Sequence, residues 1–263
     1  MDRAKIQQAA DRLWQAHETG IPCAPVRDLI GDSDVAAAYA VQEINTRRWL
    51  GGEEKVLSGR KIGLTSLSVQ HQIGVDQPDF GMLFDDMEVM DGEEIAWSRC
   101  AQPKVEAEIA FVMAAPLTGG HIKMVDVMAS IGFAVPAIEI VGSRIAGWDI
   151  RLADTIADNA SSGLYVLGQT PRRLGEFDPR LCGMVMTRNN EPVSTGAGAA
   201  CMGSPLNALL WLARTMAKAG EPLGPGDLVL SGALGPMVDV APGDAFEARI
   251  NGLGSVRAVF GKA

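Results

Sequence analysis

The stretch "PKVEAEIAFV", residues 103–112, indicates more about the fold than any other part of the sequence. Side chains on a β-strand alternate between its two faces, so Glu106 and Glu108 share one face while Val105 and Ile109 lie on the other. Same-face neighbours lie roughly 6.5 to 7 Å apart. They can therefore share one cation, or repel each other if nothing neutralises them. Taken alone, the stretch also fits a half-buried strand with one solvated face.

A helical pattern precedes this strand and a β-rich pattern surrounds it. Residues 2–18 and 33–50 are amphipathic and predict two helices. After the Gly-Gly pair at 51–52 the chain changes to short β-like runs broken by Gly, Pro and Asp. The sequence therefore predicts an α+β fold, with a helical part over 1–58 and a β-rich part over 59–263 that share one core.

Two hairpins and one helix are expected in the second half of the chain. Residues 182–196 and 244–260 each read as two strands around a turn, at Asn189–Asn190 in the first and at 251–254 in the second. Between them, residues 204–220 begin with Ser-Pro, carry an apolar face and end in Gly, which predicts a helix capped by the serine.

The charge balance and the cysteines narrow the class of protein. The 23 Lys and Arg residues against 32 Asp and Glu give a net charge of −9, which does not suit a nucleic acid or an anionic membrane as a partner. An anionic substrate would need a local positive centre. The four cysteines are scattered without a C-x-x-C pair, which predicts reduced thiols, and the charged start has no apolar run, so we expect no secretory signal. We therefore expect a cytoplasmic protein without a membrane span.

Three carboxylates are candidate metal ligands. Glu139 lies in the apolar run "VPAIEIVGSRI", and buried carboxylates such as it, Glu106 and Glu108 need a partner. Three such oxygens with water would suit Mg²⁺ or Mn²⁺. The alternative is that Glu139 pairs with Arg144 while the other two glutamates are solvated. The three histidines lack the spacing of a zinc site.

Two further charged residues are candidates for catalysis. In "SGRKIGLTS", Arg60 and Lys61 interrupt an apolar strand, and only one of two adjacent strand residues can point inward. An inward Lys61 could bind a carboxylate or stabilise an enolate; otherwise it is a solvated cation. Asp79 lies in "GVDQPDFGML", where a loop between Pro and Gly would suit an acid or base, although turn capping is equally common.

A polar segment and a glycine-rich segment are the remaining candidates for a binding loop. "DTIADNASSG", residues 154–163, can line a pocket with hydrogen-bonding groups or form a plain surface turn. "STGAGAACMGS" does not fit a dinucleotide loop, because Cys201 occupies the third glycine position. No G-x-S-x-G element of a serine hydrolase occurs.

Taken in order, seven segments resemble the 2-keto-4-pentenoate (2-hydroxypenta-2,4-dienoate) hydratases of the fumarylacetoacetate hydrolase superfamily, over about residues 33–260. The segments are "GRKIGLTS", "GVDQPDFG", "PKVEAEIAFV", "PAIEIVGSRI", "DTIADNASSG", "STGAGAA" and "SGALGPM". The resemblance implies a β-rich fumarylacetoacetase-like fold with N-terminal helices, a Mg²⁺ or Mn²⁺ site, and a place in the meta-cleavage degradation of aromatic compounds. The family's metal ligands fall on Glu106, Glu108 and Glu139.

The same resemblance suggests roles for the remaining candidates. Lys61 would stabilise a dienolate, and Asp79 would carry protons or orient water. Ser161, Asn159 and Leu234 would bind the substrate, a small anionic 2-oxoacid or dienoate. A homo-oligomer is expected, with contact to a sequential pathway enzyme as a further possibility.

Other activities remain open at this point. The related 4-oxalocrotonate decarboxylases share most of these motifs but typically have an apolar residue where this chain has Asp79, so Asp79 favours hydration. Gly235 replaces a threonine found in some hydratases, which leaves the preference for the substrate tail open. Hydrolysis and a non-enzymatic binding module are weaker alternatives.

Overall fold

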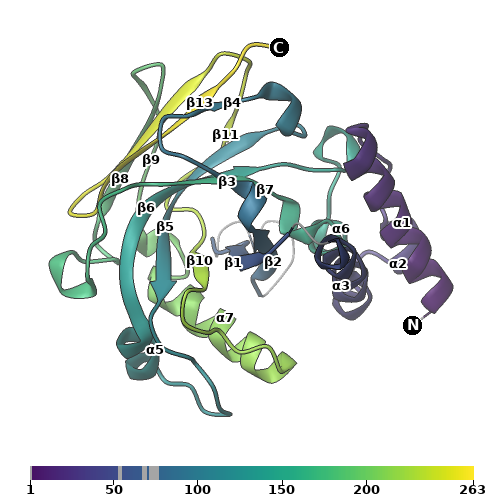
Figure 1. Ribbon diagram of the computed structural model, residues 1–263, viewed down its shortest axis with the longest axis horizontal. Coiled ribbons are helices and arrows are strands. Elements are labelled where there is room, and N and C mark those ends of the chain that lie inside the picture. The colour runs from purple at the N-terminus through teal and green to yellow at the C-terminus, as the bar shows by residue number, and fades with distance from the viewer. Residues whose placement is uncertain (1, 53–54, 67–69, 71–76) are drawn as a thin grey trace.

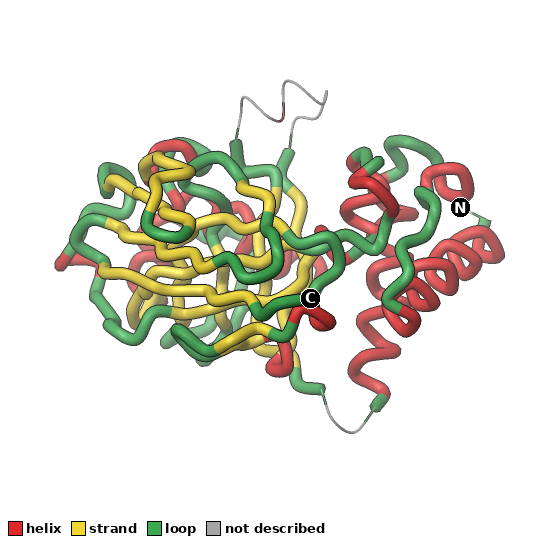
Figure 2. The backbone as a smooth tube through the Cα atoms, turned by 90° about the horizontal axis from the view of Figure 1, so that it is seen from above, coloured by secondary structure: helices red, strands yellow, loops and turns green. Residues whose placement is uncertain are grey.

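The computed structural model describes residues 2–52, 55–66, 70 and 77–263. A group of helices that carries the N-terminus lies beside a larger body of curved sheets (Figures 1 and 2). The described helices are α1 (Arg3–Thr19), α2 (Arg27–Ile30), α3 (Val35–Gly51), α5 (Met124–Ser130), α6 (Leu152–Ala157) and α7 (Pro205–Ala219).

The described strands form two sheets. The larger sheet has the order β2-β1-β10-β5-β6-β7-β3, with β11 also paired to β5, and the smaller has the order β4-β13-β12-β8-β9. Their bounds are β1 (Leu57–Gly63), β2 (Asp79–Phe84), β3 (Glu88–Val89), β4 (Glu94–Ile95), β5 (Lys104–Met113), β6 (Ile131–Val141), β7 (Ser162–Leu167), β8 (Gly183–Arg188), β9 (Glu191–Ala197), β10 (Leu228–Leu230), β11 (Val238–Asp239), β12 (Ala245–Ile250) and β13 (Gly254–Phe260). The α+β class is confirmed.

Local signals placed several elements correctly. The first hairpin, β8–β9, turns at Asn189 and Asn190, both in the left-handed region, which a two-residue hairpin loop requires. The second hairpin is β12–β13. Helix α7 has Ser204 as its cap, accepting a hydrogen bond from the backbone N–H of Leu206, and it ends at Gly220 with φ of 85°.

The buried apolar side chains of the described residues form two groups that meet at α3. The larger group lies between the sheets and α7 and includes Trp49 of α3. The second group joins the N-terminal helices to Ile145 and to α6, with Ile156 and Ala157 as members. Tyr39 of α3 packs against both groups. Whether the two parts form one structural unit stays a prediction. A domain boundary near residue 58 stays a prediction.

Strands β1 and β2 position charged residues by simple alternation. Lys61 lies opposite Gly81 and Gly63 opposite Asp79, so Lys61 and Asp79 share one face of this antiparallel pair. Arg60 is on the other face. Arg60 and Lys61 are both buried, so the expectation that only one of them could be inward is wrong. The strand pair is covered on both sides.

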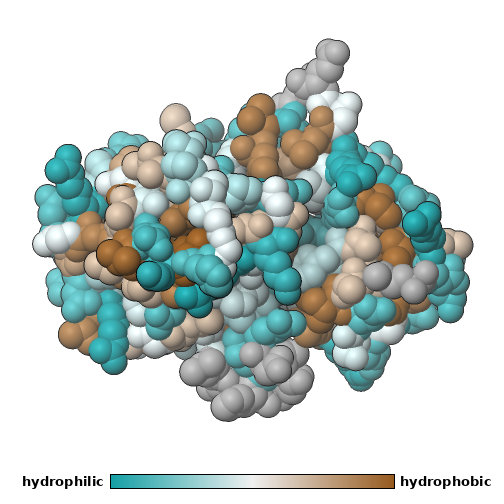
Figure 3. All heavy atoms as spheres, turned by 90° about the horizontal axis from the view of Figure 1, so that it is seen from below, coloured by the Kyte–Doolittle hydropathy of each residue, from teal (hydrophilic) through white to brown (hydrophobic). Residues whose placement is uncertain are grey.

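The surface is mixed in character. On the face drawn in Figure 3, hydrophobic residues occur in several separate groups among hydrophilic ones. Over the described part of the chain, no helix has both the length and the apolar character that a membrane crossing needs.

Candidate active site

The three predicted metal ligands lie together on two neighbouring strands. Glu106 of β5 is directly opposite Glu139 of β6, and Glu108 is the next residue of β5 on the same face. One carboxylate oxygen from each of the three lies within 4.8 Å of the others. Glu108 and Glu139 are buried and Glu106 is partly buried. The alternative of solvated glutamates is therefore not what the structure contains.

The carboxylates of this cluster are short of partners. Among the described residues, Glu108 Oε1 and Glu139 Oε2 have no hydrogen-bond partner, while Glu108 Oε2 accepts a 2.7 Å bond from the backbone N–H of Gly232. Burial and the charge of Glu139 raise the pKa of Glu106 to about 7, and the same causes raise that of Glu108 well above its usual range. Buried, crowded and unpaired carboxylate oxygens fit a hard divalent cation.

Lys61 adds an ammonium group to the cluster. Its Nζ lies 2.9 Å from Glu139 Oε1, and both side chains are nearly inaccessible to solvent. Burial alone would lower the pKa of Lys61, but the charges of Glu139, Asp79 and Glu106 outweigh it and raise the pKa. Lys61 therefore stays protonated at neutral pH. Arg144, the partner suggested for Glu139 as an alternative, pairs with Asp158 instead.

Asp79 faces the same region from β2. It is the first residue of that strand rather than part of a loop, which corrects the expectation from its Pro and Gly neighbours; residues 74–76 of the motif lie outside the described residues. Burial raises the pKa of Asp79 to about 6, Lys61 nearby lowers it, and Glu139 raises it further. An acid of this pKa exchanges protons readily near neutral pH.

Gly63 is the position that makes room for Asp79. A Cβ at Gly63 would lie 2.1 Å from Asp79 Oδ1. We expect Gly63→Ala to displace the carboxylate and to lower kcat by about 100-fold, the effect of a misplacement of roughly 1 Å. The matched control is Gly183→Ala, another strand glycine, whose added Cβ would meet nothing within 4 Å. Steady-state kinetics of the two variants checks this, and equal activity would contradict it.

The polar segment 154–163 is a short helix followed by a strained turn. The loop expected from its composition is helical over its first residues, which belong to α6. Asn159, Ala160 and Ser161 all have positive φ, at 53°, 50° and 54°. Three such residues in a row are unusual for side chains with a Cβ and are typical of functional sites. The Ser161 hydroxyl is buried and lies 3.4 Å from that of Thr155.

The other two predicted substrate contacts have structural partners. The Asn159 amide pairs with the backbone of Met82 on β2, accepting from its N–H at 2.7 Å and donating to its carbonyl at 2.9 Å. Leu234 is fully buried, and its N–H donates to the carbonyl of Ala107, between the two glutamates of β5. Both residues thus hold the site's strands in place, and their contact with substrate stays a prediction.

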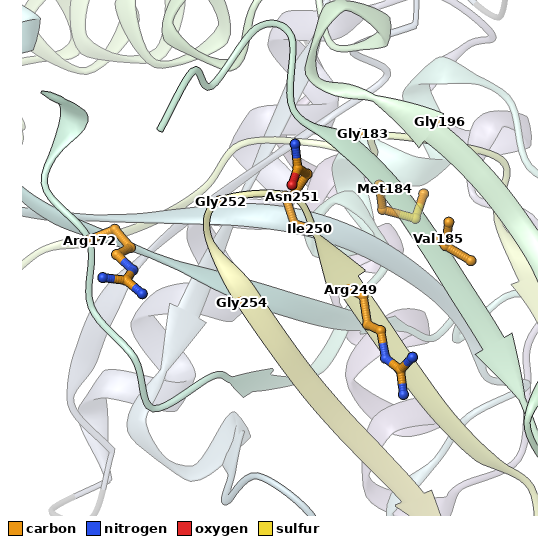
Figure 4. Close-up of a pocket in the computed structure, with 10 residues that line it drawn as sticks. All are labelled: Arg172, Gly183, Met184, Val185, Gly196, Arg249, Ile250, Asn251, Gly252 and Gly254. Atoms are coloured by element: carbon orange, nitrogen blue, oxygen red, sulfur yellow. The ribbon is translucent and has the colours of Figure 1, made fainter. Parts of the chain in front are cut away.

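One large hollow lies away from these residues. Figure 4 shows a cavity of about 780 Å³ on the smaller sheet, lined by glycines, Met184 and Val185 together with Arg172, Arg249 and Asn251. It includes none of the predicted site residues. The sequence did not predict two backbone groups that shape the site. These are Gly63, which lies beside Asp79, and the Gly232 N–H, which donates to the Glu108 carboxylate.

Comparison with known proteins identifies the family. Residues 62–260 match the family described as fumarylacetoacetate (FAA) hydrolase C-terminal. The TodF product hydratase of Pseudomonas putida is 63% identical, over 98% of this chain and 96% of that protein. A 2-keto-4-pentenoate hydratase of Paraburkholderia xenovorans is 57% identical over 97% and 94%, respectively. The 2-hydroxyhexa-2,4-dienoate hydratase of Comamonas testosteroni is 38% identical over 97% of each chain.

Solved structures agree with this grouping. The 4-oxalocrotonate decarboxylase from Pseudomonas putida G7, complexed with magnesium and adipate, superposes with a TM-score of 0.93 at 36% identity, covering 99% of this chain and 98% of the other. A fumarylpyruvate hydrolase from Pseudomonas aeruginosa shares the fold, with a TM-score of 0.63 at 16% identity over 78% and 89%. The fold is that of the fumarylacetoacetate hydrolase superfamily. Within it, the chain belongs to the 2-keto-4-pentenoate hydratase family.

Proposed function

We propose that this protein is a metal-dependent hydro-lyase that adds water to a 2-hydroxy-2,4-dienoate and forms a 4-hydroxy-2-oxoacid. The observation that carries the proposal is the grouping of three charged side chains. Lys61 Nζ lies 2.9 Å from Glu139 Oε1, and Asp79 lies on the same face of the β1–β2 pair as Lys61. This grouping occurs in a chain that is 63% identical to a hydratase. The meta-cleavage of aromatic compounds is the corresponding pathway.

The metal would be held by Glu106, Glu108 and Glu139, whose oxygens lie within 4.8 Å of one another. When bound, a divalent cation supplies Lewis acidity and a positive centre for the 2-oxoacid end of the substrate. Magnesium is supported by the related decarboxylase structure, which is complexed with it. Manganese is an equally suitable ion for an all-oxygen site.

The protein's own side chains would move the protons. Hydration removes the proton of the C2 enol hydroxyl and protonates C5, then adds the hydroxyl of water at C4, so negative charge develops on the C2 oxygen until C3 takes the remaining proton of the water. The Lys61 ammonium would stabilise that charge. Asp79, with its pKa raised to about 6, would deliver the proton or orient the water. Ser161 would donate a hydrogen bond to the substrate carboxylate.

Decarboxylation of a 4-oxalocrotonate-type substrate is the second candidate, because the decarboxylase structure superposes over nearly the whole chain at 36% identity. The higher identity of several hydratases, from 63% to 38%, favours hydration. A homo-oligomer, a pathway enzyme as a partner and a cytoplasmic location stay predictions.

An absorbance assay tests the function. We expect the metal-loaded protein to bleach the ultraviolet absorbance of 2-hydroxypenta-2,4-dienoate by consuming its conjugated double bonds, and chelation to abolish the activity. The control substrate is 2-oxo-3-hexenedioate. Release of CO₂ from it, at a rate that Asp79→Asn leaves unaltered, would favour the decarboxylase, and no bleaching by folded, metal-loaded protein would exclude the hydratase.

A further inference from the structure

The strained turn that carries Ser161 is held by one arginine, Arg144, whose side chain is largely buried, with 10% of its surface exposed. Arg144 follows β6, and its side chain reaches across to the turn: Nε donates to the Asp158 carboxylate and one terminal nitrogen to the Asp158 carbonyl. The other terminal nitrogen donates to the carbonyl of Ser162 at 2.6 Å. A single guanidinium thus binds the turn on both sides of its three left-handed residues.

The remaining groups of the turn are also engaged. The Asp158 carboxylate accepts from the backbone N–H of Arg144 at 3.0 Å and from the Ser143 hydroxyl at 3.3 Å. The carbonyl of Ser161 accepts from the N–H of Gly142 at 2.8 Å. The Ser162 hydroxyl donates to the Asn159 carbonyl at 2.7 Å. Positive φ at successive residues with side chains persists only where the surroundings fix it, and the residues around Arg144 supply that constraint.

The turn is in direct contact with the strand that faces Lys61. A Cβ added to Gly81 would lie 2.3 Å from the Asn159 carbonyl oxygen, and Gly81 is the residue opposite Lys61 in the β1–β2 pair. A shift of the turn would therefore move Ser161 and disturb the strand pair that carries Lys61 and Asp79.

We propose that Arg144, paired with Asp158, is a positioning residue for the reaction: it fixes the left-handed turn so that the Ser161 hydroxyl meets the substrate. Arg144 itself does not touch the reacting atoms. The inference rests on the proposed function for its kinetic effect, but the substrate-binding effect can be measured without turnover.

A second ion pair with a buried carboxylate and a part-buried arginine gives a matched control. Arg27 pairs with Asp154 at 2.7 Å, and the Asp154 side chain is fully buried, as that of Asp158 nearly is. Asp154 lies on α6, a few residues before the turn, and also accepts from the backbone of Val26 and Arg27. Arg27→Ala therefore removes the cationic partner of a comparable buried carboxylate, which keeps its backbone hydrogen bonds, without touching the turn.

The test compares Arg144→Ala with Arg27→Ala in the full chain. Both are expected to unfold at lower temperature than the wild type. Arg144→Ala should lose about 100-fold in kcat/KM, as expected for a displaced binding group. Calorimetry should show that pyruvate, a small 2-oxoacid, binds the Mn²⁺-loaded variant about tenfold more weakly than the Mn²⁺-loaded wild type, because one hydrogen bond to a charged group is lost. Mn²⁺ affinity should stay within about threefold, because the carboxylate cluster is unchanged. Arg27→Ala should match the wild type in all three binding and kinetic measurements.

Arg144→Lys carries the test if the alanine variant does not fold. Lysine keeps the charge for Asp158 but cannot bridge both carbonyls, so we expect an intermediate loss. Equal effects of the Arg144 and Arg27 variants, or unchanged pyruvate binding in the Arg144 variants, would overturn the proposal. A wild type without hydratase activity would refute the proposed function instead and would leave the pyruvate comparison as the test of the turn.

Discussion

Glu106→Gln combined with Glu108→Gln is expected to reduce turnover at least about 1,000-fold and to abolish measurable Mn²⁺ binding. Two of the three carboxylates whose oxygens lie within 4.8 Å of one another would be replaced by neutral amides, and a hard divalent cation needs charged oxygen ligands. Titration with Mn²⁺, followed by calorimetry, measures the binding, and the bleaching assay measures turnover.

The same double variant should be the more stable protein when no metal is present. The pKa of Glu106 is raised to about 7 from an ordinary 4.5, so the folded protein binds more protons than the unfolded chain between these two values. The free energy of unfolding of the wild type therefore falls as the pH rises from about 4.5 to about 7. Glutamine cannot ionise, so the variant does not undergo this loss.

The difference in melting temperature between the variant and the wild type should change in opposite directions without metal and with it. At pH 8 without metal the variant should melt at a higher temperature than the wild type, and added Mg²⁺ should raise the melting temperature of the wild type alone. Glu93→Gln with Glu94→Gln is the control, because it removes the same charge from two exposed residues. Tight Mn²⁺ binding by the Glu106 and Glu108 variant would refute the assignment of the site.

The sequence predicted the features that depend on alternation and on local caps. The alternation of side chains along a strand predicted that Glu106 and Glu108 share one face, and the strand register with Glu139 confirms it. The Asn189–Asn190 turn and the Ser204 cap follow from residues next to each other in the chain. These signals are local, so a single sequence contains them.

The features that escaped prediction depend on distant parts of the chain. Composition could not tell that α6 would return to the N-terminal helices, or that Arg144 would choose Asp158 rather than Glu139. The three left-handed residues of the turn contradict their own backbone preference, which only the surrounding hydrogen bonds overcome. Arg60 was not predicted to be buried because its surroundings include side chains of α3 and α7, which are distant from β1 in the sequence.

Lys61→Met is expected to lower kcat by about 1,000-fold, the upper range for removing one group that stabilises developing negative charge. The methionine fills a similar volume, so the packing of β1 is largely kept. Lys104→Met is the control, since Lys104 also forms a 2.8 Å ion pair from a strand, with Asp239, but is far more exposed. Its activity should stay close to that of the wild type.

Measurements of metal binding distinguish the role of Lys61 from that of the glutamates. Without metal, Lys61→Met leaves Glu139 buried and unpaired, which should cost about 3 kcal/mol of stability. With Mn²⁺ bound, this loss of stability should be reversed, because the cation neutralises the Glu139 carboxylate in place of Lys61. The affinity of the variant for Mn²⁺ should equal or exceed that of the wild type, because the nearby ammonium of the wild type repels a cation. Weaker Mn²⁺ binding by Lys61→Met would mean that Lys61 orients the ligands of the site, and its assignment to the substrate's developing charge would then be wrong.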